Sequence, residues 1–454
     1  MPEARDRYLT LDLALRVGEI LLSSGAGAAD VTATMLSLTH HLGLRNCEVD
    51  VTFTSLRISY QADADEPAML LIRQVRQRDI DYDDLTRVDA LVNAVLADAI
   101  DRDEARARIA RILSTGHQLP RWASTLSVGV AGAAIGLLLG GDLFVMGIAF
   151  LAAVCVDVLK WRMARRRLPE FYQQVAGGLL VTLLAAVTTA AFPEVFPQPS
   201  LVITASVIML LAGISFMGAI QDALTGFYIT GGARILEALL ATAGLIAGVS
   251  GGLTVGRLLG LDLGYLQPGA GGGFEYLPFM MFGGGVAAAA FALACYAPWR
   301  ALLPVGFIAA AAVGIYQVIV IQELSRTWAA AVAALAVGLV AYAAGGRFRV
   351  PPLVIVVPAI VPMLPGLSIY RGLSLIGAEQ GNSADGILAL GTAASIAIAL
   401  SSGVILGEYA AQPLRREARR LEQRLSGPRL VGPLRARAAR APRPQDAEAP
   451  PPNG

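Results

Sequence analysis

Apolar and polar residues follow two different patterns along this chain of 454 residues, and the pattern changes near residue 120. Before that point, apolar residues recur at helical spacing in two segments that stop at Gly25 and Gly43, and again over Leu85–Leu113. Three short runs between them, CEVDVTF, LRISY and MLLIRQV, have the length and composition of strands. The pattern predicts a small cytoplasmic α/β domain over residues 1–120, in which a helix pair, a small sheet and a second helix pair follow one another.

Beyond Trp122 the polar positions become sparse and apolar runs dominate the chain. A helix that crosses a bilayer needs about 20 residues, and ten runs approach that length. They are Trp122–Leu139, Leu143–Leu159, Phe171–Phe192, Leu201–Ile220, Ile235–Val255, Leu277–Ala297, Leu302–Ile321, Trp328–Ala344, Val350–Leu364 and Ile387–Leu406. The ninth run is short and rich in proline, so we expect a broken helix there. The pattern predicts a mainly α-helical polytopic membrane protein with ten transmembrane helices.

Composition and charge support this interpretation and indicate an orientation. Apolar residues make up 55% of the chain and charged residues 16%, which is too hydrophobic for an ordinary soluble enzyme of this size. Cations concentrate in the loops on one side of the predicted spans, namely Lys160, Arg162, Arg165, Arg166, Arg167, Arg234, Arg300, Arg347 and Arg349. The opposite loops hold Arg257, Arg326 and Arg371. By the positive-inside rule, the cation-rich loops face the cytoplasm.

Both termini are therefore expected in the cytoplasm, with the protein in the inner (plasma) membrane. Charged residues such as Asp12 and Arg16 interrupt the first apolar segment, so we expect no signal peptide. After Gln412 the chain is rich in arginine and then in proline and alanine, which predicts a basic, partly disordered tail. The predicted domains are the α/β domain 1–120, two membrane halves of five spans each at 121–260 and 261–411, and the tail 412–454.

A short echo relates the two predicted halves. The sequence LAGIS at Leu211–Ser215 ends the fourth span, and LPGLS at Leu364–Ser368 ends the ninth, 153 positions later. Five spans per half would make the second half enter the membrane from the opposite side. The sequence therefore predicts a 5+5 inverted repeat.

Pro365 and Gly366 are expected to interrupt the ninth span. Proline removes a backbone donor and glycine permits unusual dihedral angles, so backbone groups there can face a ligand. Such unwound backbone is tolerated inside a membrane where protein or a water-filled cavity satisfies it. The alternative is that Pro365–Gly366 only ends a helix at the interface. The repeated position within each half favours a binding role.

Three long segments resemble the threonine/serine exporter family. They are GEILLSSGAGAADVTATMLSLTHHLGL followed by CEVDVTFTSLRISY, then LLAGISFMGAIQDALTGFYITGGARILEAL, and VPMLPGLSIYRGL. The resemblance covers the chain up to about Gln412 and implies a fused form that carries both membrane halves. The chain departs from the family pattern at Gly27–Asp30, and at Ala212, where the second half has Pro365. An interruption at Ala212 therefore stays open. The family is associated with export of small amino acids, and split relatives with export of a dicarboxylate such as succinate.

Asp222 and Arg234 bracket the loop after the fourth span and match charged positions of the resembled family. Such a pair beside a helix break can hold the ammonium and carboxylate groups of a zwitterion, or act as a gate that opens when one member is protonated. The alternative is a solvated salt bridge at the membrane interface, which contributes little stability.

Two further acids are candidate proton carriers. Asp157 lies in the second span, close to Lys160, so an interfacial acid is the alternative for it. Glu237 lies one turn into the fifth span, where it can instead be an i,i+3 partner of Arg234.

Hydroxyl and cationic groups complete the candidate substrate site. Ser215 and Ser368 can hydrogen-bond a substrate hydroxyl, although serines in membrane helices often bond their own backbone or a neighbouring helix. Arg371 follows Ser368 closely and is the second candidate cation after Arg234.

The predicted α/β domain shows no clear metal-binding or catalytic motif. His40 and His41 are adjacent and do not share a helix face, so no metal site is expected. Thr52, Thr54 and Ser55 together with Glu19 suggest a hydrolase, but no GxSxG elbow surrounds Ser55. A regulatory or assembly role is the other interpretation of this domain.

The favoured hypothesis is a secondary exporter of threonine, serine or a similar small amino acid, coupled to protons. No Walker-type GxxxxGK[ST] loop is present, so we expect an ion gradient as the energy source, with neither cofactor nor nucleic acid involved. The alternatives are a small dicarboxylate exporter and a membrane-anchored hydrolase. The expected partners are the amino acid, protons and the lipid bilayer, and the sequence leaves a homo-oligomer open.

Overall fold

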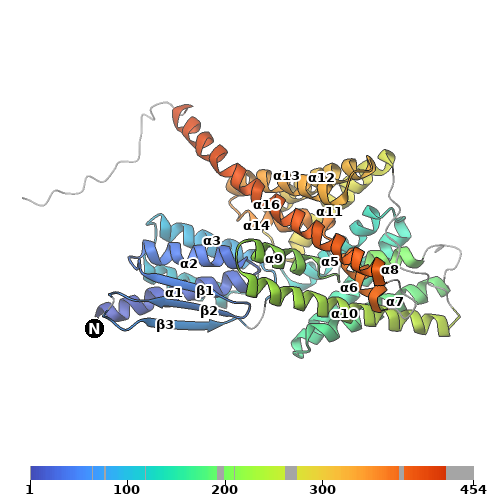
Figure 1. Ribbon diagram of the computed structural model, residues 1–454, viewed down its shortest axis with the longest axis horizontal. Coiled ribbons are helices and arrows are strands. Elements are labelled where there is room, and N and C mark those ends of the chain that lie inside the picture. The colour runs from blue at the N-terminus through green and yellow to red at the C-terminus, as the bar shows by residue number, and fades with distance from the viewer. Residues whose placement is uncertain are drawn as a thin grey trace, which may run out of the picture. The chain divides into compact units, whose positions relative to one another are not determined.

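The computed structural model describes residues 2–63, 65–75, 78–117, 119–191, 199–208, 210–260, 273–377 and 383–425 (Figure 1). The end of the predicted tail, beyond Leu425, lies outside the described residues.

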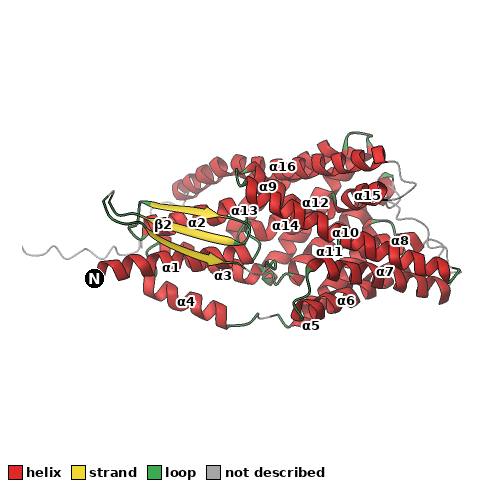
Figure 2. Cartoon of the chain, turned by 60° about the horizontal axis from the view of Figure 1, so that its bottom comes forward, coloured by secondary structure: helices red, strands yellow, loops and turns green. Residues whose placement is uncertain are grey.

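The N-terminal part of the chain combines a small sheet with four helices (Figures 1 and 2). Its elements are α1 Pro2–Ser23, α2 Ala28–His41, β1 Cys47–Val51, β2 Ser55–Tyr60, β3 Met69–Gln74, α3 Tyr82–Leu96 and α4 Arg102–Ser114. The strands are antiparallel in the order β1-β2-β3. The predicted order of helix pair, sheet and helix pair is confirmed. Gly25 and Gly43 take positive φ of 98° and 94° just beyond α1 and α2, a conformation that glycine adopts without strain.

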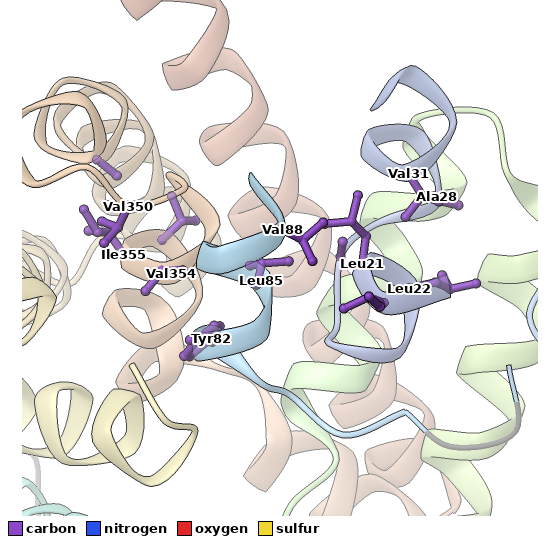
Figure 3. Packing of buried hydrophobic residues seen from close by; sticks show 14 of the residues in the cluster. Leu21, Leu22, Ala28, Val31, Tyr82, Leu85, Val88, Val350, Val354 and Ile355 are labelled. Atoms are coloured by element: carbon purple, nitrogen blue, oxygen red, sulfur yellow. The ribbon is translucent and has the colours of Figure 1, made fainter. Parts of the chain in front are cut away.

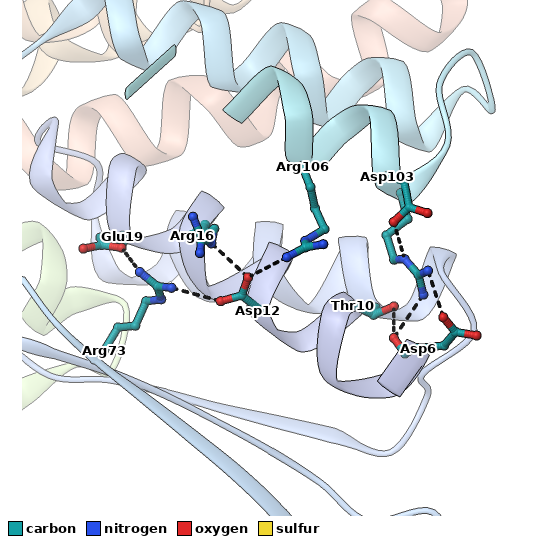
Figure 4. A network of polar contacts seen from close by, with 9 residues as sticks. Asp6, Thr10, Asp12, Arg16, Glu19, Arg73, Asp103 and Arg106 are labelled. Carbon is teal, nitrogen blue, oxygen red and sulfur yellow. Dashed lines mark hydrogen bonds and ion pairs between the residues drawn. The ribbon is translucent and has the colours of Figure 1, made fainter. Parts of the chain in front are cut away.

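An ion network holds α1 against the sheet and α4 (Figure 4). The Asp12 carboxylate accepts hydrogen bonds from Arg16 and Arg73, each at 2.9 Å, and pairs with Arg106 at 3.5 Å. Arg73 also donates to Glu19 at 2.7 Å. Removing one partner would leave the largely buried Asp12 underpaired, so the network fixes how α1 sits on this part of the molecule.

Twelve described helices, α5 to α16, lie in the region of the predicted membrane halves, and the first nine of them end at Phe348. They are α5 Arg121–Leu138, α6 Leu143–Arg165, α7 Glu170–Ala191, α8 Pro199–Ile208, α9 Gly213–Leu224, α10 Tyr228–Leu258, α11 Leu277–Ala294, α12 Trp299–Ile321 and α13 Arg326–Phe348. Three more complete the described chain, α14 Leu353–Ile360, α15 Gly366–Gly377 and α16 Ser383–Leu425. Short 3-10 turns, Phe274–Tyr276 and Val361–Met363, precede α11 and follow α14.

Eight of these helices, within the described residues, are long and apolar enough to cross a membrane. The ninth predicted span is broken as expected, because Leu353–Met363 and Gly366–Ile376 meet at a bend of 47°. The fourth predicted span, Leu201–Ile220, is wrong as one continuous helix. It is divided between α8, which ends at Ile208, and α9, which begins at Gly213.

The two interruptions lie against each other, which explains why the fourth span breaks without a proline. A Cβ placed on Gly213 would lie 3.0 Å from Leu364 Cβ, and one placed on Gly366 would lie 2.7 Å from Leu211 Cβ. Only glycine permits so close an approach. The contact is reciprocal, since each glycine faces the leucine that stands two residues before the other glycine. Tertiary packing between the two breaks therefore replaces the local signal that Pro365 supplies in the second.

Helices in the first half of the membrane region repeat their contacts in the second half. In each matched pair, a small residue on one helix lies against the backbone or side chain of its neighbour at an equivalent level. The pairs are Gly178–Leu245 with Gly338–Val404, Gly248–Val175 with Gly407–Leu335, Gly132–Ala153 with Gly285–Ala310, and Gly231–Ala219 with Gly386–Gly372. The packing of α7 on α10 is thus reproduced by α13 on α16, and that of α5 on α6 by α11 on α12.

The N-terminal part shares one hydrophobic core with the helices that follow it. Buried residues of α1, α2 and α3 belong to the same cluster as Val350, Val354 and Ile355 beside and within α14 (Figure 3). The amide of Tyr82 donates to the Cys295 carbonyl oxygen at 2.9 Å. These contacts hold the N-terminal part against the loops at one end of the membrane helices.

Candidate functional site

The predicted pair Asp222 and Arg234 forms a buried ion pair. Asp222 lies near the end of α9 and Arg234 two turns into α10, and Gly226, with a φ of 96°, turns the chain between them. Arg234 Nη1 donates to Asp222 Oδ2 at 2.6 Å, and the Asp222 side chain is only 2% exposed. The guanidinium lies over Gly218, where a Cβ would come within 2.5 Å of Nη2. The alternative of a solvated surface pair is therefore wrong.

The second oxygen of Asp222 binds the N-terminal part of the chain. Asp222 Oδ1 accepts a hydrogen bond from the Ala28 amide at 3.0 Å, 194 residues away in sequence. Ala28 is the first residue of α2, so the carboxylate meets the positive end of that helix. Both oxygens of this acid are thus engaged, one by α10 and one by α2.

Helix α9 links the ion pair to the helix interruption. Ser215, Gly218 and Asp222 stand at i, i+3 and i+7, so they share one face of α9. Ser215 begins this face just after the break at Ala212, and Asp222 ends it about 10 Å further along the axis. The acid of the charged pair and the break at Ala212 therefore stand at the two ends of one short helix.

Further charged groups surround the pair. Glu237, an exposed residue of α10, is within electrostatic reach of Arg78 and Arg234. It makes no ion pair within the described chain, because Arg234 is held by Asp222. Burial and the charge of Arg234 lower the pKa of Arg78 to about 10, so this arginine stays protonated at neutral pH. Arg78 was missed by the sequence analysis, since nothing in its local pattern distinguishes it from a surface arginine.

Asp30 of α2 is the nearest acid contributed by the N-terminal part. The residue is exposed to solvent, and a Cβ placed on Gly27 would lie 3.8 Å from Asp30 Oδ2 and 3.5 Å from Asp222 Oδ1, so both acids lie beside the same glycine. Burial and the negative charge of Asp222 raise the pKa of the Asp30 carboxyl.

Replacing Asp30 by asparagine is expected to raise the thermal stability of the purified protein near pH 7. An acid whose pKa is raised by folding contributes stability that is full below its unfolded value, 3.8, and is lost as the pH rises through the folded value. Asparagine stays neutral, so the gain should shrink as the pH falls toward about 4. Thermal unfolding in detergent measures it. Asp63→Asn, at an exposed loop acid, is the control, and equal behaviour of both variants would contradict the prediction.

Asp157 is engaged near one end of α6. Its Oδ2 accepts hydrogen bonds from Arg121 Nη2 and Thr125 Oγ1, both at 2.7 Å. The cation comes from the first residue of α5, a partner that the sequence analysis did not consider. The Asp157 carboxylate is therefore paired with a cation from the neighbouring helix.

The remaining predicted residues lie on or beside α15. Pro365 and Gly366 are buried at the interruption, and Ser368 is half-buried in the first turn of α15. Arg371 is exposed, and no ion pair is found for it within the described ranges. The structure therefore brings Asp222, Arg234 and Glu237 together at one level, and Ser215, Pro365, Gly366 and Ser368 at the crossing of the two breaks.

The residues behind the hydrolase hypothesis do not form an acid–base–nucleophile series. Glu19 is paired with Arg73, and the Ser55 hydroxyl lies 2.6 Å from that of Thr52. His41 contacts Asp98 at the surface. Over the residues that the structure describes, no group of three histidine, cysteine or acidic side chains is placed to hold a metal ion.

Comparison with known proteins identifies the family. Models of threonine/serine exporters match residues 12–256 and 281–410. The chain belongs to the threonine/serine exporter family. The "Threonine/serine exporter" of Corynebacterium glutamicum is 32% identical over 416 residues, covering 90% of this chain and 84% of the relative. The "Probable threonine/serine exporter" of Mycobacterium tuberculosis is 34% identical over 458 residues, covering 98% and 84%.

A more distant relative matches part of the chain. The "Probable succinate transporter subunit YjjP" of Escherichia coli is 26% identical over 252 residues, which cover 55% of this chain and 95% of the relative. No solved structure matches. Family membership and the eight long apolar helices make this a multi-pass membrane protein. The first family match includes most of the N-terminal part, so this part is a regular component of the family.

Proposed function

We propose that this threonine/serine exporter family member moves small amino acids of the threonine or serine type out of the cytoplasm. The observation that carries the proposal is the buried Asp222–Arg234 pair, whose acid lies on the short helix α9 that begins at the interruption at Ala212. A carboxylate and a guanidinium side by side match the ammonium and carboxylate groups of a zwitterion. The names of the two relatives at 32% and 34% identity support the same cargo.

The proposed mechanism is alternating access within a 5+5 inverted repeat. The matched helix contacts in the two halves and the reciprocal contact of Gly213 and Gly366 support it, because a two-fold related pair places the same residues opposite each other. We place the cytoplasmic side at the loops that contact the N-terminal part. Arg234 in the second turn of α10 and Arg300 in the first turn of α12 follow these loops, and both are among the cations that indicate the inner face. Both termini are then cytoplasmic.

A small dicarboxylate is the second candidate cargo. The Escherichia coli relative is named for succinate, and the cluster around Asp222 contains two guanidinium groups, those of Arg78 and Arg234. Uptake of labelled threonine, serine and succinate into inverted vesicles, with and without a pH gradient, decides between them. Uptake of none of the three would overturn the proposed function.

Export is expected to stop when a protonophore collapses the proton gradient while ATP is maintained. A transporter without a nucleotide-binding loop has no other evident energy source, and we propose that protons supply it. Threonine efflux from loaded cells, followed with ATP measured in parallel, tests this. Continued efflux at a collapsed gradient would rule out proton coupling.

Replacing Glu237 by glutamine should then remove the pH dependence of transport while the cargo still binds. Glutamine keeps the shape of the side chain but cannot carry the proton. Glu275→Gln, at an exposed acid before α11, is the matched control and should behave as the unmodified protein. An unchanged pH profile in Glu237→Gln would move the carrier role to Asp157 or Asp222.

A further inference from the structure

Arg78 of the N-terminal part lies where that part meets α9 and α10. Its Nε donates to the Leu22 carbonyl oxygen at 3.5 Å, and its guanidinium lies 5.0 Å from the centroid of the Phe53 ring. Both neighbours, Leu22 and Phe53, lie close in sequence to a residue that hydrogen-bonds α9 or α10. Leu22 precedes the turn that brings Ala28 to Asp222, and Phe53 follows Val51, whose carbonyl oxygen accepts a hydrogen bond from Thr230 of α10 at 3.2 Å.

Among the residues that the structure describes, Arg78 has no carboxylate partner. Within the described part of the chain it makes no ion pair, whereas Arg234 is held by Asp222 and Arg73 by two acids. A guanidinium carries five N–H donors, and its one protein hydrogen bond uses a single donor. The side chain is only partly buried, so the remaining donors are within reach of a small molecule.

Packing alone does not account for this placement. A role in holding the Phe53 loop would explain the ring contact, yet it does not require a second cation close to Arg234. Burial and the positive charge of Arg234 lower the pKa of Arg78. The negative charges of Asp222 and Glu237 act in the opposite direction. Arg78 and Arg234 are within electrostatic reach of each other. An anion bound between two neighbouring guanidinium groups stabilises both, and a carboxylate fits their planar, forked donors.

We propose that Arg78 and Arg234 together form a carboxylate subsite, in which Arg78 binds the carboxylate of the cargo and brings the N-terminal part into the substrate site. The inference rests on the proposed function and deepens it. Two acids beside the subsite, Asp222 and Asp30, are suited to the ammonium group of an amino acid. In this arrangement a cargo carboxylate competes with Asp222 for Arg234, which also loosens the contact between Asp222 and Ala28.

Transport by the full-length protein in inverted vesicles tests the subsite. Arg78→Gln should raise the KM for labelled threonine about 10- to 100-fold, the range expected for a lost charged hydrogen bond, with a smaller change in the maximal rate. Arg78→Lys keeps the charge without the fork and should fall between. Arg57→Gln, at an exposed arginine of the same sheet, is the matched control and should leave the KM unchanged.

Ligand-dependent thermal unfolding of the purified protein separates binding from folding. Threonine should stabilise the unmodified protein and threoninamide, which lacks the carboxylate, should not. Arg78→Gln should lose the threonine effect even where its unfolding temperature without ligand is normal. If succinate is the cargo, the same increase in the KM of Arg78→Gln for succinate supports the proposed subsite.

The inference and the proposed function fail in different ways. A normal threonine KM in Arg78→Gln overturns the subsite and leaves amino-acid export standing. Equal stabilisation by threonine and threoninamide also overturns it. Absence of threonine, serine and succinate uptake in the unmodified protein overturns the proposed function itself.

Discussion

Replacing Asp222 by asparagine is expected to abolish export and to destabilise the protein. The Asp222 side chain is 2% exposed and that of Arg234 is 15% exposed, so the variant leaves a largely buried guanidinium without its counter-charge. Breaking a buried pair from one side costs about 3–5 kcal/mol. Asparagine still offers an oxygen to the Ala28 amide, so the loss can be assigned to the missing charge. Threonine uptake into inverted vesicles and thermal unfolding in detergent measure the two effects.

Two further variants sharpen this test. Asp50→Asn removes an exposed acid that contacts Arg57 at 4.0 Å, and should change neither uptake nor unfolding noticeably. Gly218→Ala keeps every charge but places a methyl group where the Arg234 guanidinium now lies. That variant should impair uptake by moving Arg234. Normal uptake in Asp222→Asn, at normal protein levels, would show that the ion pair has no part in transport.

The sequence predicts the helices and strands of this protein better than the tertiary contacts between them. Alternation in CEVDVTF and its neighbours identifies the three strands, and glycines mark the ends of α1 and α2. Pro365 and Gly366 predict the break in the ninth span, because each of them changes the backbone at its own position. Each of these signals is local, so a single sequence is enough to read it.

The missed features depend on residues far apart in the chain. The break before Gly213 carries no proline, and it is explained by the contact with Leu364 from the other half. The bond from Ala28 to Asp222 spans 194 positions, and no periodicity relates its two ends. Arg78 is ordinary in its own segment, and it becomes a candidate only because folding brings it to the junction with α10, within electrostatic reach of Arg234.

Replacing Gly366 by alanine is expected to reduce export about tenfold or more, although alanine favours the helix by about 1 kcal/mol. The new Cβ would lie 2.7 Å from Leu211 Cβ, closer than two carbon atoms can approach, so the two breaks must separate. Overpacking of this kind typically costs about 1–3 kcal/mol. Because a helix terminator would tolerate alanine, threonine uptake per inserted protein distinguishes a close crossing from a simple helix end.

Rescue provides the sharpest form of this test. Adding Leu211→Gly to Gly366→Ala removes the Cβ that the new methyl group meets, so uptake should recover in part. Gly213→Ala should reproduce the defect from the other side, because its Cβ would lie 3.0 Å from Leu364 Cβ. Leu364→Gly, which removes that Cβ, should then relieve it. Pro365→Ala restores a backbone donor while both glycines keep their close contacts, and so tests the missing donor separately from the glycines. Normal uptake in both glycine variants would show that the close contact between the two breaks has no role in transport. The main support for alternating access at the two breaks would then be lost.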